Sequence, residues 1–126
     1  MIWVLDSSAV LADFLKEPGY EIVRASSGKH MVSTVNIAEV YAKLFERGVS
    51  AEKVEELRAI EPFSVAEFDR SQAMLSAQLR RATMHKGLSL GDRACLALAL
   101  QQKATVLTAD KAWSELDLGL EIKVIR

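Results

Sequence analysis

The sequence predicts an α/β protein, a three-layer sandwich in which helices flank a mostly parallel central sheet. Short apolar segments rich in β-branched residues alternate with longer segments whose apolar residues recur at helical spacing. The connections between the strand-like segments are too long for hairpins, which favours crossovers between parallel strands. With 126 residues, 50% of them hydrophobic, the chain is long enough for one domain with its own core, and we expect a single domain over residues 1–126.

The first half of the chain begins with a short apolar strand over residues 2–5. Asp6-Ser7-Ser8 follows and can both end that strand and cap a helix. Pro18-Gly19 breaks the first helix, and Gly48 closes a later one. The elements expected after the first strand are a helix over 8–15, a helix over 20–27, a strand over 30–33, an amphipathic helix that buries Ile37, Val40, Tyr41 and Leu44, and a helix over 51–59.

The second half repeats the alternation. Residues 62–65 form a short strand or an extended link, and a long helix over 66–85 follows, with Phe68, Leu79 and either Met74 or Leu75 inside, until Gly87 ends it. Residues 90–100 are apolar on nearly all sides, which indicates a helix covered on every face. The remaining expected elements are a strand over 105–107, a helical turn over 111–116 and a strand over 121–125.

Charge and cysteine content limit the functional classes. Sixteen Lys and Arg residues against 17 Asp and Glu residues give a net charge of -1, which argues mildly against holding nucleic acid by bulk attraction. This objection weakens if several acids lie around divalent cations, because the cations neutralise them. Cys95 is the only cysteine, and the N-terminal residues lack the features of a signal peptide, so we expect a reduced, cytoplasmic protein without a membrane span.

Two acids directly follow strand-like segments. Asp6 comes after Ile-Trp-Val-Leu, and Asp110 comes after Thr-Val-Leu-Thr-Ala. In open α/β sheets the ligand site lies beyond the carboxyl ends of the strands, so both carboxylates would face one crevice if the two strands were neighbours. Each acid alone is also explained by turn or helix-cap chemistry.

Two further acids lie on helices. Asp92 begins the covered helix and has the Ser89-x-x-Asp92 spacing of a capping box, a structural role that leaves room for a ligand role at the same end of the sheet. Glu39 lies beside the apolar stripe of its helix, where an i, i+4 pair with Lys43 would be the ordinary solvated arrangement.

If these four carboxylates converge, their repulsion has to be offset by hard divalent cations, which implies Mg²⁺ or Mn²⁺. Metal-assisted hydrolysis of a phosphodiester is the chemistry that such a site supports. A zinc site is not indicated, because Cys95 stands alone and His30 and His85 lie far apart without ligand spacing.

At these residues the sequence resembles the PIN-domain family, and in particular the VapC toxins of toxin–antitoxin pairs. The likeness covers essentially the whole chain. It lies in four segments: Leu5-Asp6-Ser7-Ser8-Ala9, Ser33-Thr34-Val35-Asn36-Ile37-Ala38-Glu39-Val40, Leu90-Gly91-Asp92-Arg93-Ala94-Cys95-Leu96-Ala97 and Val106-Leu107-Thr108-Ala109-Asp110. The resemblance implies a metal-dependent endoribonuclease, the toxin of a type II pair, which is usually a homodimer and is silenced by a cognate antitoxin packed on its helices.

Carried over position by position, the resemblance makes Asp6, Glu39, Asp92 and Asp110 the metal-coordinating and catalytic acids, with Asp110 acting directly or through water. Ser8 and Thr108 match hydroxyl residues that support such a site. Basic side chains near the acids are candidate contacts for RNA phosphates, although a basic helix end also suits the helix dipole without a ligand. They are Arg80, Arg81, Lys86, Arg93 and Lys111, with His85 beside them.

A homodimer is also favoured by the apolar helix surface, which is more than a domain of this size readily covers. Tyr41, Leu44 and Phe45 are its candidate contributors.

Three alternatives compete with this interpretation. A receiver domain requires paired acids after the first strand, and a haloacid-dehalogenase-like phosphatase requires Asp-x-Asp there, whereas Ser7 and Ser8 follow Asp6. A non-catalytic PIN-like interaction protein stays open, because the sequence alone does not place four carboxylates together in space.

Overall fold

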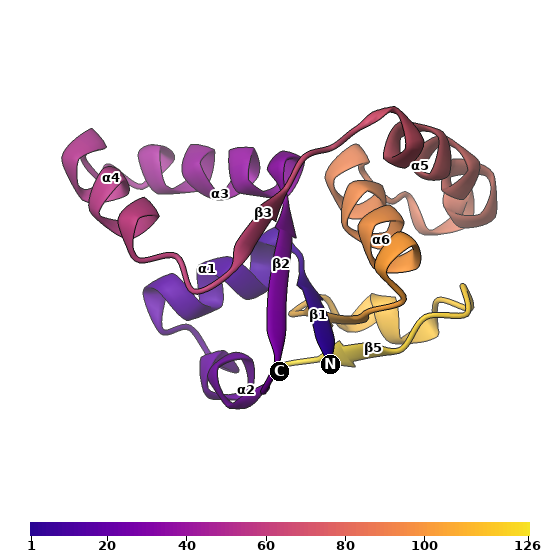
Figure 1. Ribbon diagram of the computed structural model, residues 1–126, viewed down its shortest axis with the longest axis horizontal. Helices are drawn as coiled ribbons and strands as arrows, with labels where there is room; N and C mark the ends of the chain where they lie inside the picture. The colour runs from indigo at the N-terminus through magenta and orange to yellow at the C-terminus, as the bar shows by residue number, and fades with distance from the viewer.

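A five-stranded parallel sheet forms the centre of the computed structural model, which describes residues 1–126 (Figure 1). The strands lie in the order β3-β2-β1-β4-β5, and every neighbouring pair is parallel. Their bounds are β1 Ile2–Leu5, β2 Lys29–Ser33, β3 Ser64–Ala66, β4 Thr105–Thr108 and β5 Ile122–Val124. The predicted α/β fold is therefore confirmed, with a sheet that is parallel throughout.

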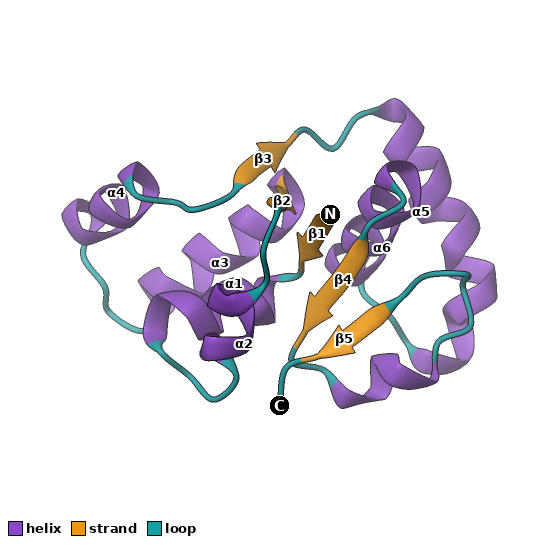
Figure 2. Ribbon diagram, turned by 60° about the horizontal axis from the view of Figure 1, so that its bottom comes forward, coloured by secondary structure: helices purple, strands orange, loops and turns teal.

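Helices cover both faces of this sheet, as Figures 1 and 2 show. Helices α1 to α4 lie on one side, and α5, α6 and the short 3-10 helix η2 lie on the other. The helices are α1 Ser7–Leu15, α2 Tyr20–Ala25, α3 Thr34–Glu46, α4 Ala51–Ala59, α5 Arg70–Thr83 and α6 Leu90–Gln102, and the 3-10 helices are η1 Met84–Lys86 and η2 Lys111–Glu115. No helix is both long and apolar enough to cross a membrane.

Alternation along the strands divides the apolar residues between two cores. In β1, Leu5 packs with α1, α3 and α4, whereas the preceding Val4 packs with α6 and Trp113 on the opposite face. Helix α6 is enclosed most completely, since residues 94–99 have no exposed surface. This enclosure explains why its sequence lacks a polar face.

Side-chain caps determine where two of the helices begin. Helix α3 begins at Thr34 because the Ser33 hydroxyl accepts a hydrogen bond from the Val35 amide. Helix α5 begins at Arg70 and not at residue 66, because Asp69 caps it through the Gln72 amide, 2.9 Å away, while Ala66 pairs with β2. Phe68 consequently lies before the helix and not on its inner face.

Side-chain burial decides one alternative and corrects one expectation. Met74 is 62% exposed, whereas Leu75 packs against the core, so Leu75 and Leu79 form the apolar part of the inner face of α5. Leu44 is fully buried in the protomer and is therefore wrong as a contributor to an interface with a second copy. Phe45, the next residue, is 50% exposed.

Candidate active site

The carboxyl ends of β1 and β4 bring two of the predicted acids to one edge of the sheet. The strands are neighbours in register, with Leu5 opposite Leu107, and the Asp6 amide donates to the Leu107 carbonyl at 3.2 Å. Asp6 and Asp110 thus follow adjacent strands, so both residues lie at the same end of the sheet.

Asp6 is buried and accepts three hydrogen bonds. Its Oδ1 atom accepts from the Ala9 amide at 2.9 Å, which caps α1, and from the Ser8 hydroxyl at 2.6 Å. Its Oδ2 atom accepts from the Thr108 hydroxyl at 2.6 Å. Both residues named from the sequence as supporting hydroxyls therefore contact this carboxylate directly.

The same hydroxyls also hold the segment after β4. Ser8 Oγ accepts from the Ala109 amide at 2.9 Å, and Thr108 Oγ1 accepts from the Asp110 amide at 3.0 Å. Each hydroxyl donates its one proton to Asp6 and accepts from the backbone, so the direction of every bond is determined. Asp110 is connected to Asp6 through Thr108.

Glu39 is held by two residues that the sequence analysis did not single out. Its Oε1 atom accepts from Ser7 Oγ at 2.9 Å and from Asn36 Nδ2 at 3.1 Å. The solvated pair with Lys43 does not form, since Lys43 pairs with Glu46 at 3.3 Å. Glu39 therefore faces the first turn of α1 and not the solvent-exposed side of α3.

Glu39 also packs against the first turn of α6. A Cβ atom at Gly91 would overlap the Glu39 carboxylate, with the carboxyl carbon 2.5 Å away. Asn36 Nδ2 donates a second hydrogen bond, to the Gly91 carbonyl at 3.0 Å. No sequence signal pointed to this contact, because Asn36 and Gly91 are 55 positions apart.

Asp92 and Asp110 each use one carboxylate oxygen as a helix cap. The predicted capping box at α6 is present: Ser89 N donates to Asp92 Oδ2 at 2.9 Å, and Asp92 N donates to Ser89 Oγ at 3.1 Å. Asp110 Oδ1 accepts from the Ala112 amide at 3.0 Å and caps η2. The second oxygen of each acid, like Oε2 of Glu39, accepts no hydrogen bond from the protein.

The charges of Asp6, Glu39 and Asp92 act on nearby buried groups. Burial raises the pKa of Asp6, hydrogen bonds from Ser8, Thr108 and the Ala9 amide oppose that rise, and the negative charge of Asp92 adds to it. Burial raises the pKa of the Cys95 thiol well above its usual range, and the charges of Asp6, Asp92 and Glu39 raise it further. Cys95, three residues after Asp92 in α6, is thus an uncharged core residue.

The acids do not form a closed cluster. No three His, Cys, Asp or Glu side chains lie close enough together to ligate one ion in this conformation. The carboxylates nevertheless offer only oxygen donors, three of them with a spare oxygen, and their mutual repulsion is the kind that a hard cation relieves. The residues present therefore fit Mg²⁺ or Mn²⁺.

The basic residues named as candidate RNA contacts differ in whether the protein already engages them. Lys86 forms an ion pair with Glu115, and Arg93 donates to the Ser76 carbonyl at 3.1 Å. Arg80, Arg81 and Lys111 are exposed and form no ion pair.

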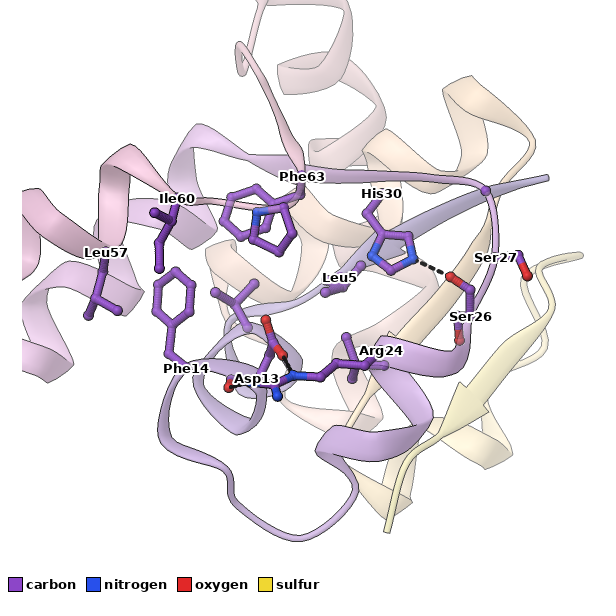
Figure 3. Close-up of a pocket in the computed structure, with 14 residues that line it drawn as sticks. Leu5, Asp13, Phe14, Arg24, Ser26, Ser27, His30, Leu57, Ile60 and Phe63 are labelled. Atoms are coloured by element: carbon purple, nitrogen blue, oxygen red, sulfur yellow. Dashed lines mark hydrogen bonds and ion pairs between the residues drawn. The ribbon is translucent and has the colours of Figure 1, made fainter.

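A cavity of about 590 Å³ contains none of the four acids. It lies between α1, α2, β2 and the segment from α4 to β3. Figure 3 shows Phe14, Leu57 and Ile60 at one end and the ion pair between Asp13 and Arg24, 2.6 Å long, toward the other. His30 lies beyond that pair, with its Nε2 atom 2.7 Å from the Ser26 carbonyl.

Comparison with known proteins identifies one family. The family model described as PIN domain matches residues 3–118. No curated protein sequence is similar enough to the chain to count as a relative.

Solved structures with the same fold are similar over nearly the whole chain. VapBC2 from Rickettsia felis, bound to a DNA fragment from its promoter, has a TM-score of 0.79 at 17% identity, and all of each chain is covered. FitAcB from Neisseria gonorrhoeae has a TM-score of 0.71 at 20% identity, covering 97% of this chain and 96% of that one. VapC20 from Mycobacterium tuberculosis, described as a sarcin-ricin loop cleaving toxin, has a TM-score of 0.72 at 15% identity, covering 90% and 93%.

The repulsion between Asp92 and Asp6 predicts that Asp92→Asn stabilises the metal-free protein. The amide removes one charge but still accepts the Ser89 N–H, so the loss at the helix cap is the smaller effect. We expect a gain of about 1 kcal/mol, seen as a rise of roughly 4 °C in Tm in EDTA. Asp117→Asn, an exposed change of equal charge that touches none of the acids, should leave Tm unchanged. If Asp92→Asn melts below the wild type, Asp92 acts only as a cap.

Proposed function

The chain belongs to the PIN-domain family, and from that premise we propose that it is a metal-dependent endoribonuclease, the toxin of a type II toxin–antitoxin pair acting in the cytoplasm. The observation that carries the proposal is the set of carboxylates at the carboxyl edge of the sheet, each oriented by protein donors and three with an oxygen to spare. Support also comes from the fold, which is shared with VapC toxins, one of them described as cleaving the sarcin-ricin loop.

The proposed metal ligands are Asp6, Glu39 and Asp92, with Asp110 acting directly or through water. Mg²⁺ and Mn²⁺ suit them because every available donor is oxygen, and the nearby Cys95 thiol is buried and protonated. When bound, such a cation would neutralise the acids and polarise the phosphate of the scissile bond.

The chain's own residues would orient the reaction. Ser8 and Thr108 donate to Asp6 and fix the plane of its carboxylate, as is usual for groups that orient a metal ligand. If Asp110 acts through water, its second carboxylate oxygen, which accepts no hydrogen bond from the protein, would be the acceptor available to a proton from the attacking water.

We propose RNA as the substrate, with phosphates outside the scissile group held by basic side chains. Arg80, Arg81 and Lys111 are free for such contacts, whereas Lys86 and Arg93 would first have to leave Glu115 and the Ser76 carbonyl. These basic residues lie close in sequence to Asp92 or Asp110. Their positive charges would attract RNA although the whole chain has a net charge of -1.

A cognate antitoxin is the proposed protein partner, and the cavity in Figure 3 is the surface proposed for it. Apolar side chains beside an ion pair between Asp13 and the half-exposed Arg24 suit an amphipathic protein segment. Phe14 lines the cavity near the C-terminal end of α1, whereas Asp6 caps the other end of the helix, so a partner seated there would have to follow α1 to reach the acids. Complexes of toxins with antitoxins are among the structures that share this fold.

A homodimer is proposed as well, supported by the exposed apolar side chain of Phe45 on α3. Tyr41 is engaged within the protomer, where its hydroxyl donates to Glu61 at 2.5 Å, so Phe45 is the stronger contributor. Light scattering at micromolar concentration should give twice the protomer mass, and Phe45→Glu should lower that mass toward a single protomer, because a charge would be buried at the interface. A protomer mass for the wild type at every concentration would contradict the dimer.

Cleavage tests the proposed activity against the alternative of a non-catalytic PIN-like interaction protein. Purified protein should cut RNA with Mg²⁺ or Mn²⁺ and not with EDTA. Asp6→Asn should reduce cleavage roughly 100-fold or more, because changing residues that only orient a metal ligand already costs about 10- to 100-fold.

Asp117→Asn is the matched control for cleavage and should cut RNA at the wild-type rate. Metal-independent cleavage, or equal cleavage by wild type and Asp6→Asn, would show that these acids are not the catalyst. Absence of cleavage by wild type on structured and unstructured RNAs would favour the interaction protein.

A further inference from the structure

We propose that Asn36 is a positioning residue, whose side-chain amide sets the Glu39 carboxylate against the first turn of α6 so that Oε2 stays available as a cation ligand. The inference rests on the proposed function, because it assumes that Glu39 ligates a cation. Asn36 itself has no free polar atom on the solvent side, being 1% exposed, and would act only through Glu39.

The contacts of Asn36 and Glu39 connect three helices, α1, α3 and α6. Its Nδ2 atom donates both to Glu39 Oε1 at 3.1 Å and to the Gly91 carbonyl at 3.0 Å, so one amide group ties α3 to α6. Ser7 Oγ, from the first turn of α1, donates to the same Oε1 atom at 2.9 Å. Oε1 therefore has two protein donors, and Oε2 has none.

The side chain of Asn36 uses its donor atom but not its acceptor atom. Its Oδ1 atom is buried without a hydrogen-bond partner, a costly arrangement in a protein interior. Turning the amide over would not help, because Oδ1 would then face Glu39 Oε1 and the Gly91 carbonyl, both acceptors. Asn36 thus keeps its two donor contacts at the expense of an unpaired oxygen.

Gly91 provides the space that this arrangement needs. Its backbone is not in the left-handed region, so the absence of a side chain matters through contact and not through strain. A Cβ atom there would overlap the carboxylate that Asn36 holds. The close approach of Glu39 to α6 therefore depends on Gly91 for room and on Asn36 and Ser7 for direction.

Binding of Mn²⁺ to the full-length protein, measured from the EPR signal of the free ion, tests the inference. Asn36→Leu has nearly the same shape and removes both donors and the unpaired oxygen. We expect its dissociation constant for Mn²⁺ to rise about 10-fold or more, while Tm in EDTA stays the same or rises. A structural residue would show the opposite pattern, with a lower Tm and unchanged Mn²⁺ affinity.

Gln72→Leu is the matched control. Gln72 is also a buried amide with one unpaired oxygen, but it donates to Gln101 at 3.1 Å, at the far end of α6. This variant should bind Mn²⁺ as the wild type does. Ser7→Ala, which removes the other donor on Oε1, should weaken Mn²⁺ binding in the same direction and decides the question if Asn36→Leu does not fold.

The outcomes separate this inference from the proposed function. Wild-type affinity in both Asn36→Leu and Ser7→Ala would overturn the positioning role and leave the metal site standing. A wild type that binds no Mn²⁺ at millimolar concentration would overturn both. Weaker binding in Asn36→Leu with a normal Gln72→Leu would establish the positioning role.

Discussion

Repulsion between carboxylates at the carboxyl edge of the sheet has to be offset by the contacts around them. Asp6 is buried, and burial together with the charge of Asp92 raises its pKa, so the folded chain carries an electrostatic cost at this edge. Hydrogen-bond donors offset part of that cost. They come from the starts of α1 and α3, from the loop before α6 and from the end of β4, so the four segments nearest the acids are also those that stabilise them.

Helix capping and the proposed chemistry use the same side chains without conflict. Asp6 caps α1, Asp92 completes the capping box of α6, and Asp110 caps η2. A carboxylate has two oxygens, and in Asp92 and Asp110 only one serves the cap. The structural role thus fixes the orientation of the other oxygen, as expected for a rigid site built on helix ends. Glu39 is different, because it lies within its helix and is oriented by Ser7 and Asn36 instead.

Local patterns explain which parts could be predicted from the sequence. The strand order was not predicted, but apolar runs followed by Asp6 and Asp110 placed both acids at strand ends, and Ser89 with Asp92 has the spacing of a capping box. The donors to Glu39 could not be found this way, because the contact between Asn36 and Gly91 depends on how α3 packs on α6. Helix α5 starts later than predicted because β3 extends to Ala66. Leu44 lies in the core and not at an interface, and the spacing of apolar residues cannot distinguish these two locations.

The proposed metal site requires Asp6, Glu39 and Asp92 to hold one cation, and a crystal structure of the protein with Mn²⁺ is the direct measurement. Anomalous scattering locates the ion independently of the protein coordinates. The proposed site predicts a single strong peak about 2.1 Å from oxygens of Asp6, Glu39 and Asp92, with Glu39 contributing Oε2 and keeping Ser7 and Asn36 on Oε1. An ion bound away from these residues, or a site that leaves Asp92 in its capping role alone, would contradict it.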